Sequence, residues 1–226
     1  MRKPLRLDPS KTAALFIDLQ EEHRRDTRYL VEGYGTTLLN ARRLQDAARR
    51  NGVAVYHCAY IVDLATLDRP FHPVGADGRS AFSDKDDPLT AICPDVAPLD
   101  GERILLKNEA SAFGKSPLLG ELRESGVEWL AVAGVWTEAC VDATVKDAVN
   151  HGLRVLLVKD ACGSGGIAMH QAGILNLANR LYGGAVVDTE AACALMDGGT
   201  VEAWQVEGSV PLRFTFENAA TLYEQL

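Results

Sequence analysis

The sequence has no Cys-x-x-Cys pair, no basic cluster and no long apolar run, and each absence excludes a class of protein. Its five cysteines are spread along the chain, at Cys58, Cys93, Cys140, Cys162 and Cys193. Because this spacing fits neither a zinc knuckle nor a disulfide framework, we expect free, reduced thiols. The apolar stretch Ala13–Ile17 is too short for a signal peptide, and no stretch is long enough to span a membrane. We therefore expect a cytoplasmic protein with no membrane partner.

Lysine and arginine are not gathered in any part of the chain. The formal net charge is −8, and no group of basic residues could follow a phosphate backbone, which argues against a nucleic-acid partner. Internal repeats, low-complexity tracts and interdomain linkers are also absent. The 226 residues suit one large domain with a full hydrophobic core. We place this domain at residues 1–196 and treat residues 197–226 as a C-terminal extension.

Strand patterns and helix patterns alternate along the domain. Short apolar runs predict strands at residues 12–18, 53–60, 103–106, 129–133, 153–158 and 185–187. Helical spacing of apolar residues predicts helices at residues 38–51, 117–126, 141–149, 167–180 and 189–195. This alternation indicates an α/β fold in which helices cover both faces of a parallel sheet.

Two segments differ in character from the rest. Residues 61–101 have no sustained periodicity and are rich in Asp, Pro and Gly, which predicts a lid, a pocket wall or a subunit contact. In the C-terminal extension, residues 203–206, 210–212 and 214–216 look partly extended, and residues 218–226 look helical. We interpret the extension as an oligomer contact rather than a second domain.

Cys140 opens the helix that follows the strand at residues 129–133, with Gly134 between them. The first turn of a helix is the positive end of its dipole, which favours the thiolate form of a cysteine. The position also lies outside the carboxyl end of a strand, where ligands bind in open α/β sheets. Free cysteine is nevertheless among the most buried residue types. Position alone is therefore compatible with a nucleophile or with a structural thiol.

Asp18 ends the first strand and Lys107 follows the third. Both are therefore expected at the same edge of the sheet as Cys140. Singly, an Asp at a strand end is often a cap, and a lysine is often solvated. Together the three residues suit one chemistry, because a carboxylate can take the proton of a thiol and an ammonium can stabilise the thiolate and hold the carboxylate. The set predicts nucleophilic catalysis.

Three motifs occur in order along residues 11–193: Ala13–Gln20, then Leu106–Lys107 with Ser111–Phe113, and then Gly134–Val141 with Thr144 and Ala148. In residue types, order and spacing they resemble the motifs of the isochorismatase-like cysteine hydrolases. That superfamily includes nicotinamidases, N-carbamoylsarcosine amidase, and biuret and ureidoacrylate hydrolases. The resemblance is specific for the superfamily and carries little information about the substrate.

The resemblance implies a three-layer α/β/α sandwich around a doubly wound parallel sheet of about six strands, the isochorismatase-like hydrolase fold. It implies that Asp18 is the general base, Lys107 its electrostatic partner and Cys140 the nucleophile. The family also has a cis peptide bond that corresponds here to Val135–Trp136. The backbone N–H groups of Trp136 and Cys140 are then expected to form an oxyanion hole.

The sequence departs from the family's pattern at two places. His23 stands where members commonly have Phe, and it follows Glu21 and Glu22, which fits either a polar pocket wall or a solvated helical turn. The Asp-x-His pair with which nicotinamidases hold a metal is missing after the second strand, although His57 and His72 are nearby. We therefore predict no metal, no cofactor and a substrate other than nicotinamide.

The residues expected to contact the substrate belong to the three motifs, except His23, which lies beside the first motif. Trp136 could stack on a planar amide, a urea or a delocalised cation, or it could fill core volume. Glu138 and its acidic neighbours would suit a polar or cationic substrate such as biuret or guanylurea. The expected substrate-binding residues are Gln20, His23, Ser111, Phe113, Trp136 and Glu138.

The sequence thus predicts a cysteine-dependent amidohydrolase that cleaves a C–N bond of a small amide or urea through a Cys140 thioester and releases ammonia. The resemblance and the apolar tail predict a homo-oligomer, either a dimer or a tetramer. Because isochorismatases hydrolyse a vinyl ether without the thiol, an ether hydrolase is one alternative. A non-catalytic binding member of the same fold is the other.

Overall fold

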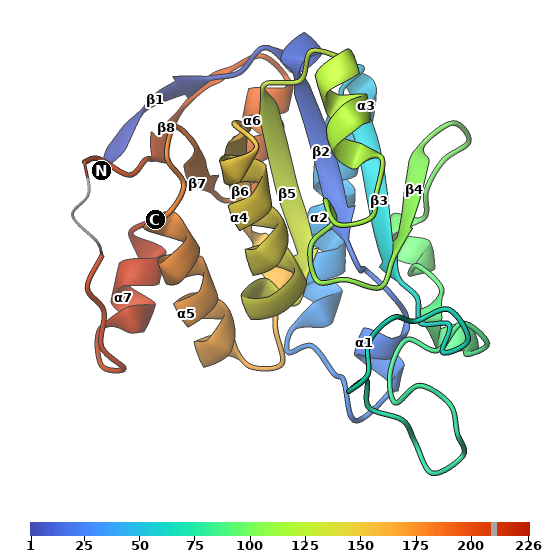
Figure 1. Ribbon diagram of the computed structural model, residues 1–226. Coiled ribbons are helices and arrows are strands. Elements are labelled where there is room, and N and C mark those ends of the chain that lie inside the picture. Colours follow the sequence, from blue (N-terminus) through green and yellow to red (C-terminus); the bar gives the residue numbers. More distant parts are fainter. Residues whose placement is uncertain (209–211) are drawn as a thin grey trace.

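A mixed sheet of eight strands forms the centre of the protein (Figure 1). The computed structural model describes residues 1–208 and 212–226, so residues 210 and 211 of the expected extended stretch lie outside the described residues. Across the sheet the strands are ordered β1-β8-β7-β6-β5-β2-β3-β4. Their bounds are β1 (Arg2–Arg6), β2 (Thr12–Ile17), β3 (Ala54–Tyr60), β4 (Arg103–Lys107), β5 (Trp129–Val135), β6 (Arg154–Gly163), β7 (Ala185–Val187) and β8 (Thr200–Trp204).

Helices cover both faces of the sheet and give the three layers that the sequence predicts. Their bounds are α1 (Glu22–Arg25), α2 (Tyr34–Arg50), α3 (Leu118–Glu124), α4 (Asp142–Asn150), α5 (Ile167–Ala178), α6 (Thr189–Met196) and α7 (Ala219–Glu224). Three 3-10 turns lie at Pro9–Lys11, Pro88–Thr90 and Pro94–Val96, and a π-helix lies at Thr137–Val141. Helices α2 and α6 pack on one face, while α3, α4 and α5 pack on the other (Figure 1).

The six strands from β7 to β4 run parallel, which confirms the predicted parallel sheet. Each residue of β5 is buried, and alternate side chains enter opposite cores. Leu130 and Val132 contact the layer of α3, α4 and α5, whereas Ala131 and Ala133 contact the layer of α2 and α6. A strand buried on both faces has a continuous apolar sequence, which explains why the sequence pattern locates this strand.

The sheet also has an antiparallel edge that the sequence pattern does not predict. Strand β8 pairs with β7 and β1, both antiparallel, with Leu5 opposite Val201. Of the five residues of β1, only Leu5 is buried, so this strand has no apolar run to mark it. Residues Thr200–Trp204, which the sequence pattern places in the C-terminal extension, therefore belong to the central sheet.

The order of the strands places a topological switch point between β2 and β5. From β2 the chain builds the sheet towards β3 and β4, and from β5 it builds in the opposite direction towards β6 and β7. In open α/β sheets, ligands bind outside the carboxyl ends of the strands at such a point. Asp18 follows β2 directly, and Cys140 lies five residues after the end of β5. Both residues are therefore delivered to the same crevice.

Gly134 allows β5 to approach β2 closely beside this crevice. It pairs with Ile17 in the sheet and has a backbone φ of +131°. A Cβ atom at this position would lie 2.1 Å from the carbonyl oxygen of Ile17. Any side chain would therefore push the two strands apart at the point where they present Asp18 and the π-helix.

We expect Gly134→Ala to lower the free energy of unfolding by about 3 kcal/mol or more, because the added methyl group meets fixed backbone atoms. The urea midpoint of the variant measures this loss. Gly120→Ala is the matched control, since it lies in α3 and no atom is within 4 Å of the place that a methyl group would take there. That change should be neutral or should stabilise by up to about 1 kcal/mol. Equal midpoints for the two variants would contradict the expected clash.

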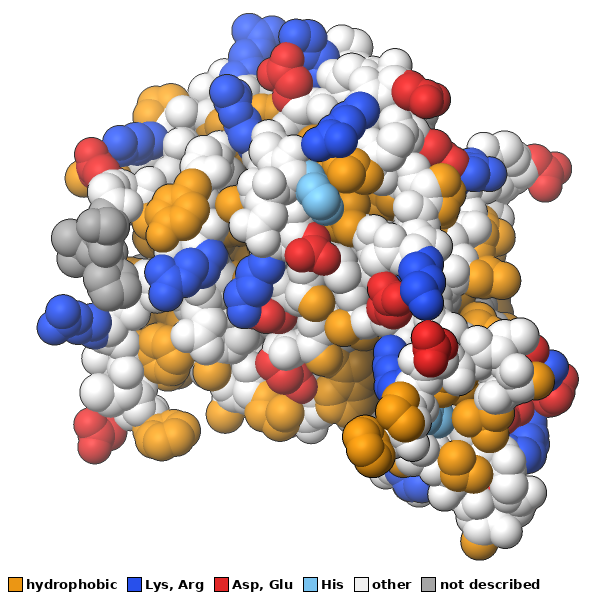
Figure 2. Space-filling view, viewed as in Figure 1, with side chains coloured by type: hydrophobic (Ala, Val, Ile, Leu, Met, Phe, Trp, Pro, Cys, Tyr) orange, Lys and Arg blue, Asp and Glu red, His pale blue; other side chains and the backbone are white. Residues whose placement is uncertain are grey.

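Residues 61–101 form a lobe beside the carboxyl ends of β2, β3 and β4, at the lower right of Figure 1. The lobe is tied to the body of the protein by backbone hydrogen bonds, among them Ile61 N–H to Lys107 O (2.8 Å) and Cys93 N–H to Leu19 O (2.8 Å). In the space-filling view it projects from the body, with hydrophobic side chains beside charged ones (Figure 2). Among the described residues, no helix combines the length and apolar character that crossing a membrane requires.

Candidate active site

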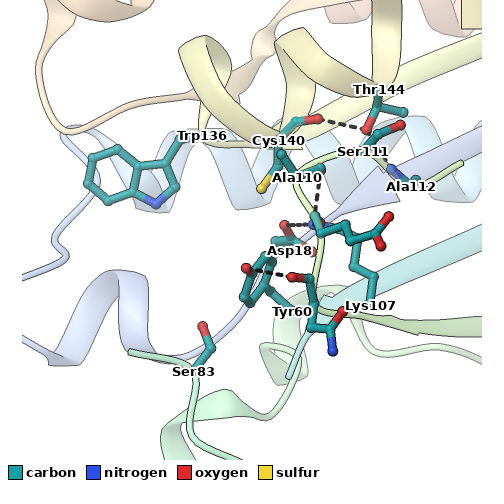
Figure 3. A network of polar contacts seen from close by, with 12 residues as sticks. Asp18, Tyr60, Ser83, Lys107, Ala110, Ser111, Ala112, Trp136, Cys140 and Thr144 are labelled. Carbon is teal, nitrogen blue, oxygen red and sulfur yellow. Dashed lines mark hydrogen bonds and ion pairs between the residues drawn. The ribbon is translucent and has the colours of Figure 1, made fainter. Parts of the chain in front are cut away.

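Asp18 is buried at the end of β2, where an unusual backbone turn directs its side chain towards Lys107 (Figure 3). Its φ is +51°, a conformation that few residues other than glycine adopt and that is often found at functional sites. The turn is held by hydrogen bonds from Asp18 N–H to Cys58 O (3.1 Å) and from Gln20 N–H to Asp18 O (2.9 Å). Within the described chain, the Oδ1 atom of Asp18 accepts no hydrogen bond and is free to take a proton.

Lys107, the last residue of β4, forms a buried ion pair with Asp18. Its Nζ lies 2.7 Å from Asp18 Oδ2, and the two side chains are only 4% and 3% exposed. The ammonium also donates hydrogen bonds to the carbonyl oxygens of Glu109 (3.1 Å) and Ala110 (3.2 Å). Burial, the largest single effect, lowers the pKa of Lys107, but the charge of Asp18, the hydrogen bond to it and the nearby thiols together outweigh burial and raise that pKa. Lys107 therefore remains protonated and holds the carboxylate in place.

Cys140 lies in the π-helix, and its sulfur points towards the carboxylate of Asp18 (Figure 3). The turn is held to the next helix by the hydroxyl of Thr144, which donates to Cys140 O (2.6 Å). The same hydroxyl accepts a hydrogen bond from Ala112 N–H (3.0 Å). One threonine thus connects the cysteine to the loop that follows Lys107, so that the three residues keep a fixed arrangement.

The ionisation of Cys140 differs from the sequence-based expectation. The helix dipole favours the thiolate, but burial, together with the charge of Asp18, raises the pKa of the thiol to about 12. The ammonium of Lys107 offsets this rise only in part. The expectation of a thiolate is therefore wrong for the free protein, since a desolvated sulfur beside a carboxylate keeps its proton.

The peptide bond between Val135 and Trp136 is cis, as the resemblance implies. The N–H of Trp136 donates no hydrogen bond to any of the described residues. The indole ring lies beside His23, with Trp136 Nε1 3.4 Å from His23 Nδ1 and the two rings edge to face. Burial lowers the pKa of His23, so its imidazole is neutral at pH 7.

A cavity of about 520 Å³ opens onto Asp18 and Cys140, a size suited to a small organic molecule. One wall comes from α1 and the loop after it, and another comes from the π-helix at Thr137–Val141 and the residue before it. A further wall comes from the lobe at residues 61–101. The lining combines aromatic rings with polar and ionisable side chains. The lining residues are Asp18, Glu22, His23, Tyr29, Tyr60, Arg69, Phe82, Ser83, Ala110, Trp136, Ala139 and Cys140.

Comparison with known proteins shows the family to which the chain belongs. Residues 12–191 match the family model of the isochorismatase domain. The protein belongs to the isochorismatase family. A maleamate amidohydrolase from Pseudomonas putida is 35% identical over 190 residues, which cover 80% of this chain and 85% of the relative. An N-carbamoylsarcosine amidase from Arthrobacter is 25% identical, over 83% of this chain and 72% of the relative.

A solved structure supports the same relationship. The crystal structure of an isochorismatase from Pseudomonas putida superposes with a TM-score of 0.69 at 25% identity, over 83% of this chain and 92% of that structure. Both the sequence motifs and the fold of this isochorismatase-family protein therefore agree with the predicted hydrolase fold.

Of the six residues expected to bind substrate, His23 and Trp136 line the cavity. Gln20 does not, because it is fully buried and its amide is used within the protein. Its Nε2 donates to the carbonyl oxygens of Tyr60 (3.0 Å) and Thr90 (2.8 Å), and its Oε1 accepts from Tyr60 N–H (2.8 Å). Gln20 fastens the lobe to the end of β2 instead of contacting a ligand.

Ser111, Phe113 and Glu138 are not among the lining residues of this cavity, and their contact with a substrate stays a prediction. Phe113 packs against the ring of His151 at 5.3 Å and is not among the lining residues. Glu138 is not among them either, and it accepts a hydrogen bond from Ser164 Oγ (2.6 Å). Ser111 lines a separate cavity of about 270 Å³, which Lys107 also lines. Membership of a motif therefore does not by itself place a side chain in the cavity.

The sequence pattern does not identify Glu22 and Ser83 as site residues. Glu22 is buried, and both of its oxygens accept hydrogen bonds from Ser83, from the backbone N–H (3.0 Å) and from the hydroxyl (2.5 Å). Burial raises the pKa of Glu22, although the bonds from Ser83 oppose the rise. The signal that the sequence offers for Glu22 is a charged residue in the first turn after β2, and that pattern also fits a solvated helical turn.

His57, in β3, and His72, in the lobe, each contact another side chain of the protein. His57 Nε2 lies 2.9 Å from Glu102 Oε2, and His72 Nε2 lies 2.7 Å from Ser80 Oγ. Neither histidine lines the cavity. Across residues 1–208 and 212–226, no three His, Cys, Asp or Glu residues gather in a way that could hold a metal ion. Independence from metal stays a prediction, which chelation tests.

Proposed function

We propose that the protein is a cysteine-dependent amidohydrolase that cleaves the C–N bond of a small amide or urea. The observation that carries this proposal is the convergence of Cys140 with the buried Asp18–Lys107 ion pair on one wall of a cavity. A thiol, a carboxylate with an unoccupied oxygen and a fixed ammonium are the groups that acyl transfer to sulfur requires. The names of the relatives, maleamate amidohydrolase and N-carbamoylsarcosine amidase, support cleavage of C–N bonds.

In the proposed reaction, Asp18 takes the thiol proton as the sulfur of Cys140 bonds to the substrate carbonyl carbon. The two events are concerted, because the raised pKa of the thiol disfavours a free thiolate. The tetrahedral intermediate then breaks its C–N bond while Asp18 returns the proton to the leaving nitrogen. Water attacks the resulting thioester with Asp18 as base, releasing the acid and restoring the thiol.

The negative charge on the tetrahedral oxygen needs donors that are already in position. The backbone N–H groups of Trp136 and Cys140 are the proposed donors, and the N–H of Trp136, which has no acceptor among the described residues, supports this role. Fixed donors of this kind stabilise an oxyanion more than water does, because they do not reorganise during the reaction. Lys107 is a positioning residue in this scheme, since it acts through Asp18.

The proposal is tested by ammonia release from a panel of small amides and ureas. The panel contains maleamate, ureidoacrylate, an N-carbamoyl amino acid, biuret, guanylurea and nicotinamide, each with and without a chelator. We expect the wild-type protein to release ammonia from at least one compound, and Cys140→Ser to release none above background. Chelator should have no effect. Silence across the whole panel would favour the alternative of a non-catalytic binding member of the fold instead.

The ether-hydrolase alternative makes an opposite prediction, because activity of that kind does not need the thiol. Turnover of a vinyl ether by Cys140→Ser at the wild-type rate would favour it.

The expected homo-oligomer and the cytoplasmic location stay predictions. Light scattering after size-exclusion chromatography measures the first directly.

A further inference from the structure

Arg69 brings a positive charge to the rim of the cavity, and no carboxylate of the described residues pairs with it. It is exposed, lies in the lobe at residues 61–101 and lines the same cavity as Cys140. Its Nη1 donates to the hydroxyl of Tyr60 (3.0 Å), and its Nη2 donates to the carbonyl oxygen of Asn108 (2.6 Å). Both acceptors are neutral. None of the ion pairs formed by the described residues includes Arg69.

The two hydrogen bonds hold the guanidinium of Arg69 in place and leave some of its N–H donors available. A guanidinium has five N–H donors, so the two bonds leave three donors for a ligand. The hydroxyl of Tyr60 in turn donates to Asn108 O (2.8 Å), and this closes a triangle of contacts around Arg69. A side chain held in this way loses little conformational entropy when it binds an anion.

The other ionisable groups at or beside the cavity have hydrogen-bond or ion-pair partners within the protein, or are neutral. Lys107 is paired with Asp18, and both carboxylate oxygens of Glu22 are bonded by Ser83. His23 is neutral, because burial lowers its pKa. Among the described lining residues, Arg69 is therefore the one positively charged side chain that an anionic ligand could meet. The aromatic rings of Tyr60 and Phe82 lie beside each other at 5.8 Å, giving an apolar wall.

We propose that Arg69 binds a carboxylate of the substrate, so that the substrate is a short amide or urea that carries a carboxylate at its other end. This proposal rests on the proposed function, which places the scissile carbonyl at Cys140. Arginine suits the role because its planar fork matches the two oxygens of a carboxylate. A monoamide of a four-carbon dicarboxylic acid or an N-carbamoyl amino acid has this chemistry. A cationic substrate such as guanylurea does not.

The test compares maleamate with methyl maleamate, in which the same amide is kept and the carboxylate charge is removed. We expect Arg69→Met to raise KM for maleamate by about 10-fold or more while leaving kcat within a few-fold, since one charge-assisted contact is lost. Ammonia release from methyl maleamate should be unchanged. Arg69→Lys should restore part of the affinity for maleamate.

Arg79→Met is the matched control, because Arg79 lies in the same lobe but pairs with Asp84 and does not line the cavity. It should leave both substrates unaffected. If Arg69→Met impairs maleamate and methyl maleamate equally, Arg69 is only a brace of the lobe and the proposal is wrong. It is also wrong if wild-type protein hydrolyses neutral amides and ignores carboxylates, an outcome that leaves the proposed function intact.

A second readout does not depend on turnover. Maleate, which has the carboxylates but no scissile amide, should slow the alkylation of Cys140 by iodoacetamide in wild type but not in Arg69→Met. Protection without ammonia release from any substrate would support the carboxylate site and contradict the proposed function. Absence of protection in wild type, with no preference for maleamate over its ester, would overturn the carboxylate site.

Discussion

Replacing Cys140 by alanine is expected to lower kcat/KM by at least about 10⁴-fold, because the variant lacks the atom that bonds to the substrate. The change removes one small side chain next to the cavity, so the unfolding midpoint should stay close to that of the wild-type protein. Ammonia release measures the loss of activity, and urea unfolding shows that the fold is kept. Cys140→Ser should also be inactive, because a serine hydroxyl in this site is a much weaker nucleophile.

Cys193→Ala is the matched control for this loss. Its thiol is half-buried on α6, on the opposite face of the sheet, and donates to Arg43 O at 3.6 Å. All five cysteines are free, so removing one breaks no disulfide. We expect full activity from this variant. Comparable losses from Cys140→Ala and Cys193→Ala would show that thiol removal acts through stability and not through chemistry.

Replacing Asp18 by asparagine is expected to lower kcat by about 10²–10⁴-fold, the usual contribution of a general acid–base group. The substitution keeps the shape of the side chain but removes its ability to take a proton. It should also make Cys140 more acidic, because the charge of Asp18 raises the pKa of the thiol and the charge of Lys107 lowers it. Loss of turnover would therefore accompany an easier ionisation of the nucleophile.

The pH dependence of Cys140 alkylation by iodoacetamide, followed by peptide mass spectrometry, measures this shift. In the wild-type protein the rate should still be rising at pH values well above neutrality, since the pKa of the thiol is raised to about 12. In Asp18→Asn the rate should level off at lower pH, and in Lys107→Met it should rise later than in wild type. A variant of Asp18 with near wild-type kcat, or with an unchanged alkylation profile, would contradict the proposed role of the carboxylate.

Each of these single changes leaves a buried charge without its partner, which can cost about 3–5 kcal/mol of stability. The double variant Asp18→Asn with Lys107→Met removes both charges and separates stability from catalysis. We expect it to recover much of the lost unfolding free energy while remaining inactive. Recovery of activity together with stability would show that the ion pair serves the fold alone.

The sequence predicts the parallel strands and the convergence of Asp18, Lys107 and Cys140 for the same physical reason. Strands buried on both faces carry uninterrupted apolar runs, as in Ala13–Ile17 and Trp129–Ala133. Asp18 follows the first run directly, and Cys140 lies in the π-helix that follows the second. Parallel strands bring their carboxyl ends to one edge, so position in the sequence is enough to bring Asp18 and Cys140 together. Strand β1 carries no such run, because only Leu5 of its five residues is buried.

The cavity walls could not be predicted in the same way. Arg69, Phe82 and Ser83 come from a lobe without periodicity, whose shape depends on hydrogen bonds between distant residues such as Gln20 and Thr90. Those long-range bonds leave no local pattern. Gln20 shows the converse, since a polar residue within a motif is used entirely by the fold.

The state of the thiol could not be judged from helix position either. The dipole of a short helical turn favours the thiolate by a modest amount, whereas burial and the adjacent carboxylate both favour the neutral form. These opposing effects depend on the side chains around Cys140, which come from separate strands and loops. Only the assembled site shows that burial and the adjacent carboxylate together raise the pKa of the thiol.

The most direct test of the proposed chemistry is to look for the thioester itself. The protein is mixed with the amide of the panel that it hydrolyses fastest and is quenched in acid within the first turnovers. Its intact mass is then measured by mass spectrometry. We expect the mass to rise by that of the acyl group, the modification to map to the peptide containing Cys140, and hydroxylamine to remove it as the hydroxamate. Steady ammonia release from a protein whose mass never changes, and whose activity survives complete alkylation of Cys140, would contradict the thioester mechanism.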